Sequence, residues 1–432
     1  MPNYVALGPE ISPGVWDINS VHALTHTPTT LPSNYKLISH KLNDASKILY
    51  EYCFAEPGQL RTRTIYTKRI RKARISSGLS KIVWASNYVG YGNSFKWFSY
   101  AAIRTMANLG IPVKSYSWTP GSVDPDLPFA RATDDDIKNA LTITITRWSP
   151  HPGVIKLLER EAGALLGYLQ VEGTLVKRGF INWLNRFDAI LATSTASKQA
   201  ILDSGINVPV HVFGHGIDPV QFPYVDRPAD RQPFTFFHFA DVQRRKGTDL
   251  VIKAFKALSY KDIRLYIKCQ GPSISLVKLA DSNQYVIETK GDNRIVWDDN
   301  NYSPNELAGL LGRMDCGLFP SRAEGFGMPK LECEATGMPC IATAFGGYLD
   351  HSIPDGTLLL NVEEWQPSDF DKGNQAEPDV DHLIHLMKHC MENRDEAKRR
   401  GNLASKNAHT KWKWVDKVRE LMDVLVCYGW KS

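Results

Sequence analysis

The chain has 432 residues, of which 43% are hydrophobic and 22% are charged. This composition is that of a globular protein with two or three ordinary domains, and it excludes a disordered or low-complexity chain. No stretch approaches the ~18 uninterrupted apolar residues that a spanning helix needs, and no secretory signal is visible at the start. Seven scattered cysteines without metal-ligand spacing favour reduced thiols. We therefore expect a cytoplasmic protein.

The net charge of +5 is confined to the first 80 residues, which hold ten lysines and arginines against five acids. The remaining chain holds 41 of each sign. Seven cations gather in residues 61–74 with no acid among them: Arg61, Arg63, Lys68, Arg69, Arg71, Lys72 and Arg74. They form either a solvated basic face or a contact for a polyanion. Because on a helix they would spread around the whole axis, an extended strand along a phosphate backbone is favoured over a membrane-lying helix.

Residues 1–80 are rich in turn formers and predict an irregular N-terminal extension, with one helix across 43–53. Regular alternation begins with a strand at 81–86. A turn containing Gly90 and Gly92 follows, then a helix ending at Gly110 and a strand at 111–118. Further strands are expected at 141–146, 164–170, 188–193 and 209–213. This order is typical of a doubly wound parallel sheet.

A second set of alternating elements begins after a proline-rich linker, with strands expected at 234–240, 262–268, 294–297, 316–321 and 339–343. The predicted fold is α/β, with two Rossmann-like domains facing across a cleft. The predicted domains are the extension 1–80, an acceptor domain 81–218, a linker 219–233, a nucleotide-binding domain 234–407, and a C-terminal helix in 408–432 that packs back towards the first domain. Ligands of such sheets bind beyond the carboxyl ends of the strands.

The stretch PSRAEGFGMPKLECEATG, residues 320–337, carries the clearest chemistry. A strand is followed by a loop with Glu324 and by Gly325-Phe326-Gly327, and then by a helix with proline in its first turn. The amides of these three residues would face the cleft from a helix N-terminus, a position suited to phosphate or hydroxyl groups. Glu332, eight residues after Glu324, would reach another part of the same extended ligand.

This stretch resembles the signature of the retaining, GT-B-fold glycosyltransferases called glycosyl transferases group 1, whose E-x7-E pattern is met by Glu324 and Glu332. The resemblance implies that Glu324 faces the hydroxyls of the transferred sugar and that Glu332 binds the ribose. It implies that the amides of Gly325, Phe326 and Gly327 support sugar and phosphate. It also implies a nucleotide-sugar cosubstrate, a UDP- or GDP-sugar, with no further cofactor. We expect no metal, because the acidic runs 134–136 and 298–299 lie in polar, loop-like stretches away from the donor loop.

The stretch FHFADVQRRKGTDLVIKAF is similar to the part of that family where a basic residue meets the donor diphosphate, and Lys246 fits that position. The family often has an arginine where this chain has Asp241. Arg244 or Arg245 would then take its place, and we favour Arg245. Two adjacent cations suit a diphosphate leaving group, because negative charge grows on it as the glycosidic bond breaks.

Two further positions follow from the resemblance. The turn with Gly90 and Gly92 is where the family lets the backbone approach the donor phosphates. Glu172 ends a strand at the cleft edge, where many relatives present a histidine. It would either act in catalysis by binding the acceptor hydroxyl or cap the next helix.

Three functions remain open at this point. The first is a retaining glycosyltransferase with same-face transfer, acting on a hydroxyl of a glycan or of a modified base in nucleic acid. The second is a sugar-nucleotide epimerase or a phosphorylase on the same fold. The third is a non-catalytic nucleic-acid-binding protein, which would explain residues 61–74 but nothing in 320–343. The EGFG loop and the Lys246 corner favour the first, with nucleic acid as the favoured polyanion.

Overall fold

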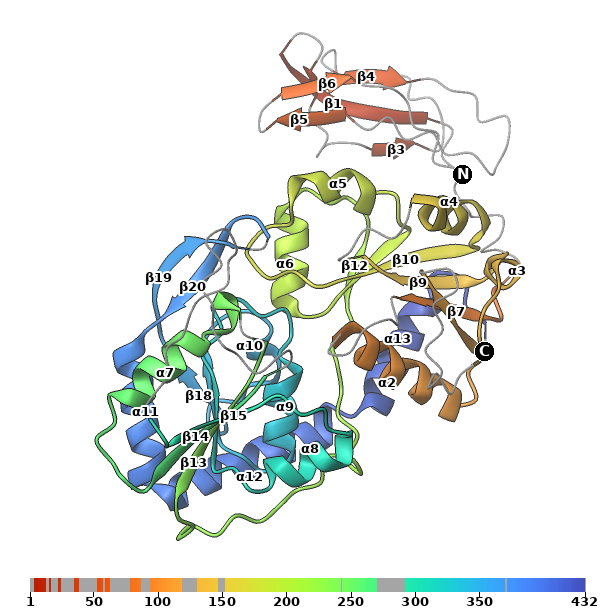
Figure 1. Cartoon of the computed structure of the whole chain (residues 1–432). Coiled ribbons are helices and arrows are strands. Elements are labelled where there is room, and N and C mark those ends of the chain that lie inside the picture. The colour runs from red at the N-terminus through yellow and green to blue at the C-terminus, as the bar shows by residue number, and fades with distance from the viewer. Residues whose placement is uncertain are drawn as a thin grey trace. The chain divides into compact units, whose positions relative to one another are not determined.

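The structure is a computed structural model that describes residues 78–86, 94–118, 130–146, 152–241, 243–269, 292–369 and 371–431, together with several strands among the first 62 residues. The chain divides into two compact units, Met1–Gly78 and Leu79–Ser432 (Figure 1).

The first unit contains antiparallel strands. β1 (Tyr4–Ser12) pairs with β2 (Val15–Trp16), β3 (His22–Leu24) and β4 (Tyr35–Ile38), and β5 (Cys53–Glu56) pairs with β6 (Gln59–Thr62). These strands correct the expectation of an irregular extension. Its turn formers include Pro9, which lies inside β1 at a register shift, the kind of position where a strand tolerates proline. Arg61 lies in β6, whereas the expected helix, apart from Cys53, and residues 63–77 lie outside the described residues.

The second unit begins with a parallel six-stranded sheet of order β12-β11-β10-β9-β7-β8. Its strands are β7 (Ile82–Ser86), β8 (Val113–Ser117), β9 (Leu141–Ile145), β10 (Ala164–Leu169), β11 (Ala189–Ala192) and β12 (Val210–Val212). The helices that alternate with them are α2 (Ser94–Asn108), α3 (Asp134–Ile137), α4 (Pro152–Glu161), α5 (Arg178–Leu184) and α6 (Thr195–Asp203). The central strands are buried throughout, because a parallel sheet carries helices on both faces.

A second parallel six-stranded sheet follows, of order β15-β14-β13-β16-β17-β18. Its strands are β13 (Phe234–Phe239), β14 (Ile263–Lys268), β15 (Ile295–Asp298), β16 (Cys316–Phe319), β17 (Cys340–Thr343) and β18 (Leu358–Leu360). The helices are the 3₁₀ turn η2 (Arg244–Lys246), α7 (Thr248–Lys256), α8 (Pro304–Leu311), α9 (Met328–Ala335), α10 (Tyr348–His351), α11 (Val380–Glu392) and α12 (Arg394–Lys411). These two sheets confirm the α/β fold of paired Rossmann-like domains. The hairpin of β19 (Val362–Pro367) and β20 (Asn374–Pro378) was not predicted.

The last helix, α13 (Trp414–Val426), returns to the first sheet and contacts α2 (Figure 1). Trp414, Val418, Leu421 and Leu425 recur at helical spacing and join the hydrophobic core of the first domain. The chain thus passes from the first domain to the second and back. Among the described residues, no helix combines the length and apolarity needed to cross a membrane.

Candidate functional site

A cavity of about 320 Å³ lies between the two sheets of the second unit, at the carboxyl ends of their strands. This is where open α/β sheets bind ligands. The first domain lines it from α2, from the end of β10 and from residues 215–218, and the second domain lines it from the segments after β13 and β16. The charged and polar residues at its centre are Gln170, Glu172, Arg245, Lys246, Glu324 and Glu332.

The loop after β16 is fixed by glycines. A side chain at Gly325 would collide with Gln170, and one at Gly327, whose φ is +93°, would collide with the ring of Tyr348. Helix α9 begins at Met328 with Pro329 in its first turn, as the sequence indicates. Glu324 directly precedes Gly325, and the loop that carries its carboxylate to the cavity therefore depends on glycine at positions 325 and 327.

Backbone donors at this loop remain available to a ligand. Within the part of the chain that the structure describes, the amides of Gly325, Phe326 and Gly327 donate to no protein acceptor. They precede the N-terminus of α9, where the helix dipole favours negative charge. Phe326 and Gly327 line the cavity directly.

The segment after β13 brings two cations to the same place. Arg245 Nη1 lies 3.1 Å from Glu172 Oε1 and 3.9 Å from Glu324 Oε2, and Lys246 Nζ donates to Glu324 Oε2. Gly247 follows in the left-handed region with φ +72°, and a side chain there would collide with the carbonyl of Pro320. Burial works to lower the pKa of Arg245, but the charges of Glu172 and Glu324 outweigh it and raise that pKa.

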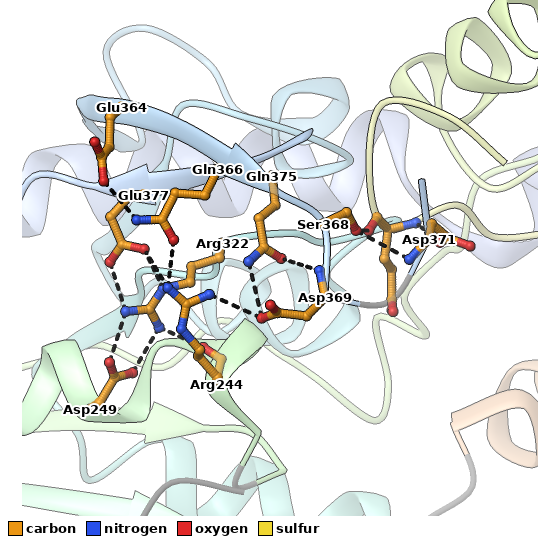
Figure 2. Close-up of polar contacts among 11 residues, drawn as sticks. Arg244, Asp249, Arg322, Glu364, Gln366, Ser368, Asp369, Asp371, Gln375 and Glu377 are labelled. Atoms are coloured by element: carbon orange, nitrogen blue, oxygen red, sulfur yellow. Dashed lines mark hydrogen bonds and ion pairs between the residues drawn. The ribbon is translucent and has the colours of Figure 1, made fainter. Parts of the chain in front are cut away.

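The two neighbouring arginines have different positions. Arg245 lines the cavity, whereas Arg244 donates to Asp369, Gln366 and Glu377 of the β19–β20 hairpin (Figure 2). Arg245 is therefore the arginine placed beside the glutamates, and Lys246 lies next to it. Asp241 also lines the cavity.

Glu172 and Glu332 approach the cavity from opposite domains. Glu172 follows β10 and accepts from Gln170 Nε2 at 2.6 Å as well as facing Arg245. Glu332 lies on α9 with its side chain partly exposed, and burial of its carboxyl group raises its pKa to about 8. Glu332 therefore holds its proton at neutral pH in the structure as it stands.

A buried ionic cluster supports the loop from behind. Lys330 Nζ lies 2.8 Å from Glu334 Oε1, and His351 lies between Glu334 and the carbonyl of Phe326, which it contacts through Nε2 at 3.0 Å. Burial would raise the pKa of Glu334, but Lys330 and His351 hold it at about 2. The cluster fixes the orientation of the Phe326 peptide, and no sequence pattern pointed to it.

His215 occupies the wall between the domains. Its Nε2 lies 2.8 Å from the Tyr168 hydroxyl, and its ring packs against Phe98 and Phe326. Burial, with a smaller effect of His351, lowers its pKa to about 3, so the imidazole is neutral. These contacts pack His215 between the two domains and fix the orientation of its ring.

The structure does not describe several of the site residues that the sequence predicted. Gly90, Gly92 and the cations from Arg63 to Arg74 lie outside the described residues. Conversely, sequence reasoning did not identify the cavity residues Trp97, Tyr100 and Arg104 on α2, or Gln170. The sequence signal for the α2 residues is that they lie off the apolar stripe of this helix, which Phe98, Ala102 and Met106 form at helical spacing. Among the residues described, no group of three or more His, Cys, Asp or Glu is arranged to hold a metal ion.

Comparison with known proteins bears on this geometry. Residues 233–372 match the sequence profile of the family Glycosyl transferases group 1. The match contains Arg245, Lys246, Glu324 and Glu332, and it supports the family that the EGFGMPKLE stretch indicated. A D-inositol 3-phosphate glycosyltransferase of Arthrobacter sp. (strain FB24) is 32% identical over 192 residues, which are 42% of this chain and 45% of that protein. The similarity thus spans less than half of that relative's length.

Two solved structures resemble most of the chain. Sucrose-phosphate synthase from Thermosynechococcus elongatus has a TM-score of 0.59 at 15% identity, covering 80% of this chain and 98% of the synthase. Anabaena HepE in complex with UDP-glucose has a TM-score of 0.57 at 13% identity, covering 80% and 99% of the two chains. At such low identity these likenesses show the fold, which is GT-B.

Proposed function

We propose that this protein transfers a sugar from a nucleotide-sugar donor to an acceptor hydroxyl, with retention of anomeric configuration. The observation that carries the proposal is the convergence of Arg245 and Lys246 on Glu324 and Glu172, beside the amides before α9 that donate to no acceptor among the described residues. The profile match and the names of the curated relatives support sugar transfer as the reaction class.

The cations and amides form a site for the donor diphosphate. Lys246 and Arg245 would bind its oxygens, and the amides of Gly325 to Gly327 would bind sugar and phosphate together. These groups act most strongly as the bond to the diphosphate breaks, because negative charge develops there. Glu332 would bind the ribose. The HepE complex favours a UDP-sugar among the candidate donors.

Transfer would take place on one face of the sugar. The bond from the anomeric carbon to the diphosphate oxygen breaks while a bond to the acceptor oxygen forms on the same side, and the acceptor proton passes to the departing phosphate oxygen. Glu324 would hold the sugar hydroxyls and Glu172 the acceptor hydroxyl. The protein's contribution is thus positioning and charge stabilisation, with two cations in the role that a divalent metal has in other transferases.

A donor screen tests this function. UDP-, GDP- and ADP-sugars are incubated with the protein and candidate acceptors, and both nucleotide and sugar products are identified by NMR. Transfer predicts release of nucleoside diphosphate and a product with the donor's anomeric configuration. An epimerase would change the sugar without releasing nucleotide. A phosphorylase would leave the nucleotide-sugars intact and, in a parallel incubation of a glycan with inorganic phosphate, would cleave a glycosidic bond to give a sugar 1-phosphate. Either result would contradict the proposal.

A further inference from the structure

The β19–β20 hairpin joins the two domains next to the proposed site. Its base is fixed in the second domain, where Arg322 contacts Glu377 through Nε at 2.6 Å and Nη2 at 2.7 Å, and Asp249 through Nη1 and Nη2 (Figure 2). The Arg322 side chain is 4% exposed, and its carbonyl accepts from the amide of Ala376. This bidentate, buried Arg–carboxylate contact fixes the base of the hairpin to the second domain.

The hairpin tip, residues 368–373 without 370, lies against the segment of the first domain that follows β10. Leu175 and Lys372 exchange backbone hydrogen bonds of 3.0 and 2.9 Å, and the amide of Thr174 donates to the carbonyl of Asn374. Gly173 lies so close that a side chain there would approach Lys372 O to 2.9 Å. The tip therefore docks by backbone pairing at a fixed register.

Both backbone groups of Glu172 are held by this tip. The Glu172 amide donates to Asp371 Oδ2 at 2.6 Å, and its carbonyl accepts from Ser368 Oγ at 3.1 Å. The Glu172 carboxylate meanwhile faces Arg245. The hairpin also contacts the chain next to the other partner of that ion pair, because Asp369 accepts from Arg244, the residue before Arg245, at 3.0 Å.

We propose that Ser368 and Asp371 are positioning residues for Glu172, so that the hairpin holds the acceptor-side glutamate at a set distance from the donor-side cation Arg245. The inference rests on the proposed function, in which Glu172 orients the acceptor hydroxyl. In this proposal the hairpin holds Glu172 of the first domain close to Arg245 of the second domain. A shift of about 1 Å in such a group is enough to slow transfer strongly.

The experiment uses the full chain with Asp371→Ala, which removes the acceptor of the Glu172 amide, and Asp371→Asn, which keeps an oxygen there. Ser368→Ala removes the donor to the Glu172 carbonyl, and it tests the role of the hairpin if Asp371→Ala folds poorly. Glu363→Ala is the matched control, because it removes one exposed acid from β19 without touching Glu172.

Two readouts are measured. Hydrogen exchange of the peptide spanning residues 169–175 should be at least tenfold faster in Asp371→Ala, and near the wild-type rate in Asp371→Asn and Glu363→Ala. With a UDP-sugar as donor, kcat of Asp371→Ala should fall about tenfold while donor KM stays within about twofold, because the diphosphate groups are untouched. Asp371→Asn should recover most of kcat.

The outcomes separate the two claims. Unchanged exchange at 169–175 in both Asp371→Ala and Ser368→Ala would overturn the role of the hairpin, whatever the activity. Faster exchange with an unchanged kcat would overturn its role in positioning for transfer. A wild-type protein that transfers no sugar would contradict the proposed function, while the exchange rates would still decide whether the tip holds Glu172.

Discussion

The two domains of the second unit have the same parallel six-stranded architecture but provide different parts of the cavity. The second domain provides closely packed charges on loops that glycines fix: Arg245, Lys246 and Glu324. The first domain provides Glu172 and Gln170 after β10, and a mixed aromatic and basic face of α2. In the second domain Arg245, Lys246 and Glu324 lie against one another, whereas among the described residues of the first domain Glu172 lies apart from the Arg104–Asp218 ion pair.

This difference between the two domains explains why the sequence predicts donor binding but not the acceptor. The profile match covers 233–372, which lies in the second domain alone, the domain that we propose binds the donor. A diphosphate and a ribose are common to many donors, so the groups that bind them recur in one short pattern. An acceptor differs from enzyme to enzyme, and the groups that bind it carry no shared pattern.

The largest effect is expected at Glu324. Glu324→Gln should lose at least tenfold in kcat while the fold survives, because a charge-assisted hydrogen bond to the sugar is weakened and Lys246 loses the negative charge of its partner. Steady-state kinetics and thermal unfolding of the variant measure both parts. Wild-type turnover in Glu324→Gln would contradict the proposed role of Glu324 in holding the sugar hydroxyls. Glu363→Gln serves as the control of matched chemistry.

A smaller effect is expected at Glu332 and depends on pH. Its carboxyl has a pKa near 8 when folded and near 4.5 when unfolded, so the folded protein keeps a proton that the unfolded chain has released. Raising the pH from 5 to 8 should therefore destabilise wild type relative to Glu332→Gln, by about 1–3 kcal/mol after allowing for partial exposure of the side chain. Urea unfolding of both proteins at several pH values measures this. A difference that stays constant with pH would show that Glu332 is already ionised.

Metal removal should have little effect on the donor side. Arg245 and Lys246 would supply the positive charge, so transfer rates with and without a chelator should agree within about twofold. Activity that a chelator abolishes and Mn²⁺ restores would contradict the assignment of both cations.

The smallest effect on transfer is expected from the basic segment of the first unit. Replacing Lys68, Arg69, Arg71 and Lys72 with glutamine should leave turnover of a small acceptor unchanged. If these four contact duplex phosphates, wild-type DNA binding should weaken with salt at a slope of roughly −3.6 in log K against log [salt], and the variant should lose most of that dependence. Equal, salt-insensitive binding by both proteins would leave the segment as a solvated face.

Much of the second unit could be predicted because its signals are local. Apolar runs such as FTFFHF and the glycine and proline positions around α9 define strands and helix ends by themselves. The strands of the first unit were missed because β1 contains Gly8 and Pro9, which are ordinarily turn formers. The β19–β20 hairpin was missed because most of β19 is exposed and carries no apolar alternation.

The candidate site was predictable to the same extent. Glu324, Lys246 and Arg245 lie in two short stretches, and the structure brings them together. Arg244 and Arg245 are neighbours in a single 3₁₀ turn, and their side chains point to different sides of it. A hydrophobic periodicity in the sequence does not show which of the two faces the cavity. The contacts of Glu172 with Ser368 and Asp371 join residues almost 200 positions apart, and only the assembled domains show them.

The most direct test is calorimetric titration of UDP into wild type, Lys246→Ala and Lys253→Ala. Lys253 is an exposed lysine on α7 of the same domain, so its variant matches the change in charge without touching the cavity. Lys246→Ala should bind UDP about tenfold more weakly than wild type, whereas Lys253→Ala should bind it as wild type does. Equal UDP affinity in all three proteins, or no binding of UDP, GDP or ADP when each is titrated into wild type, would contradict the assignment of the diphosphate site.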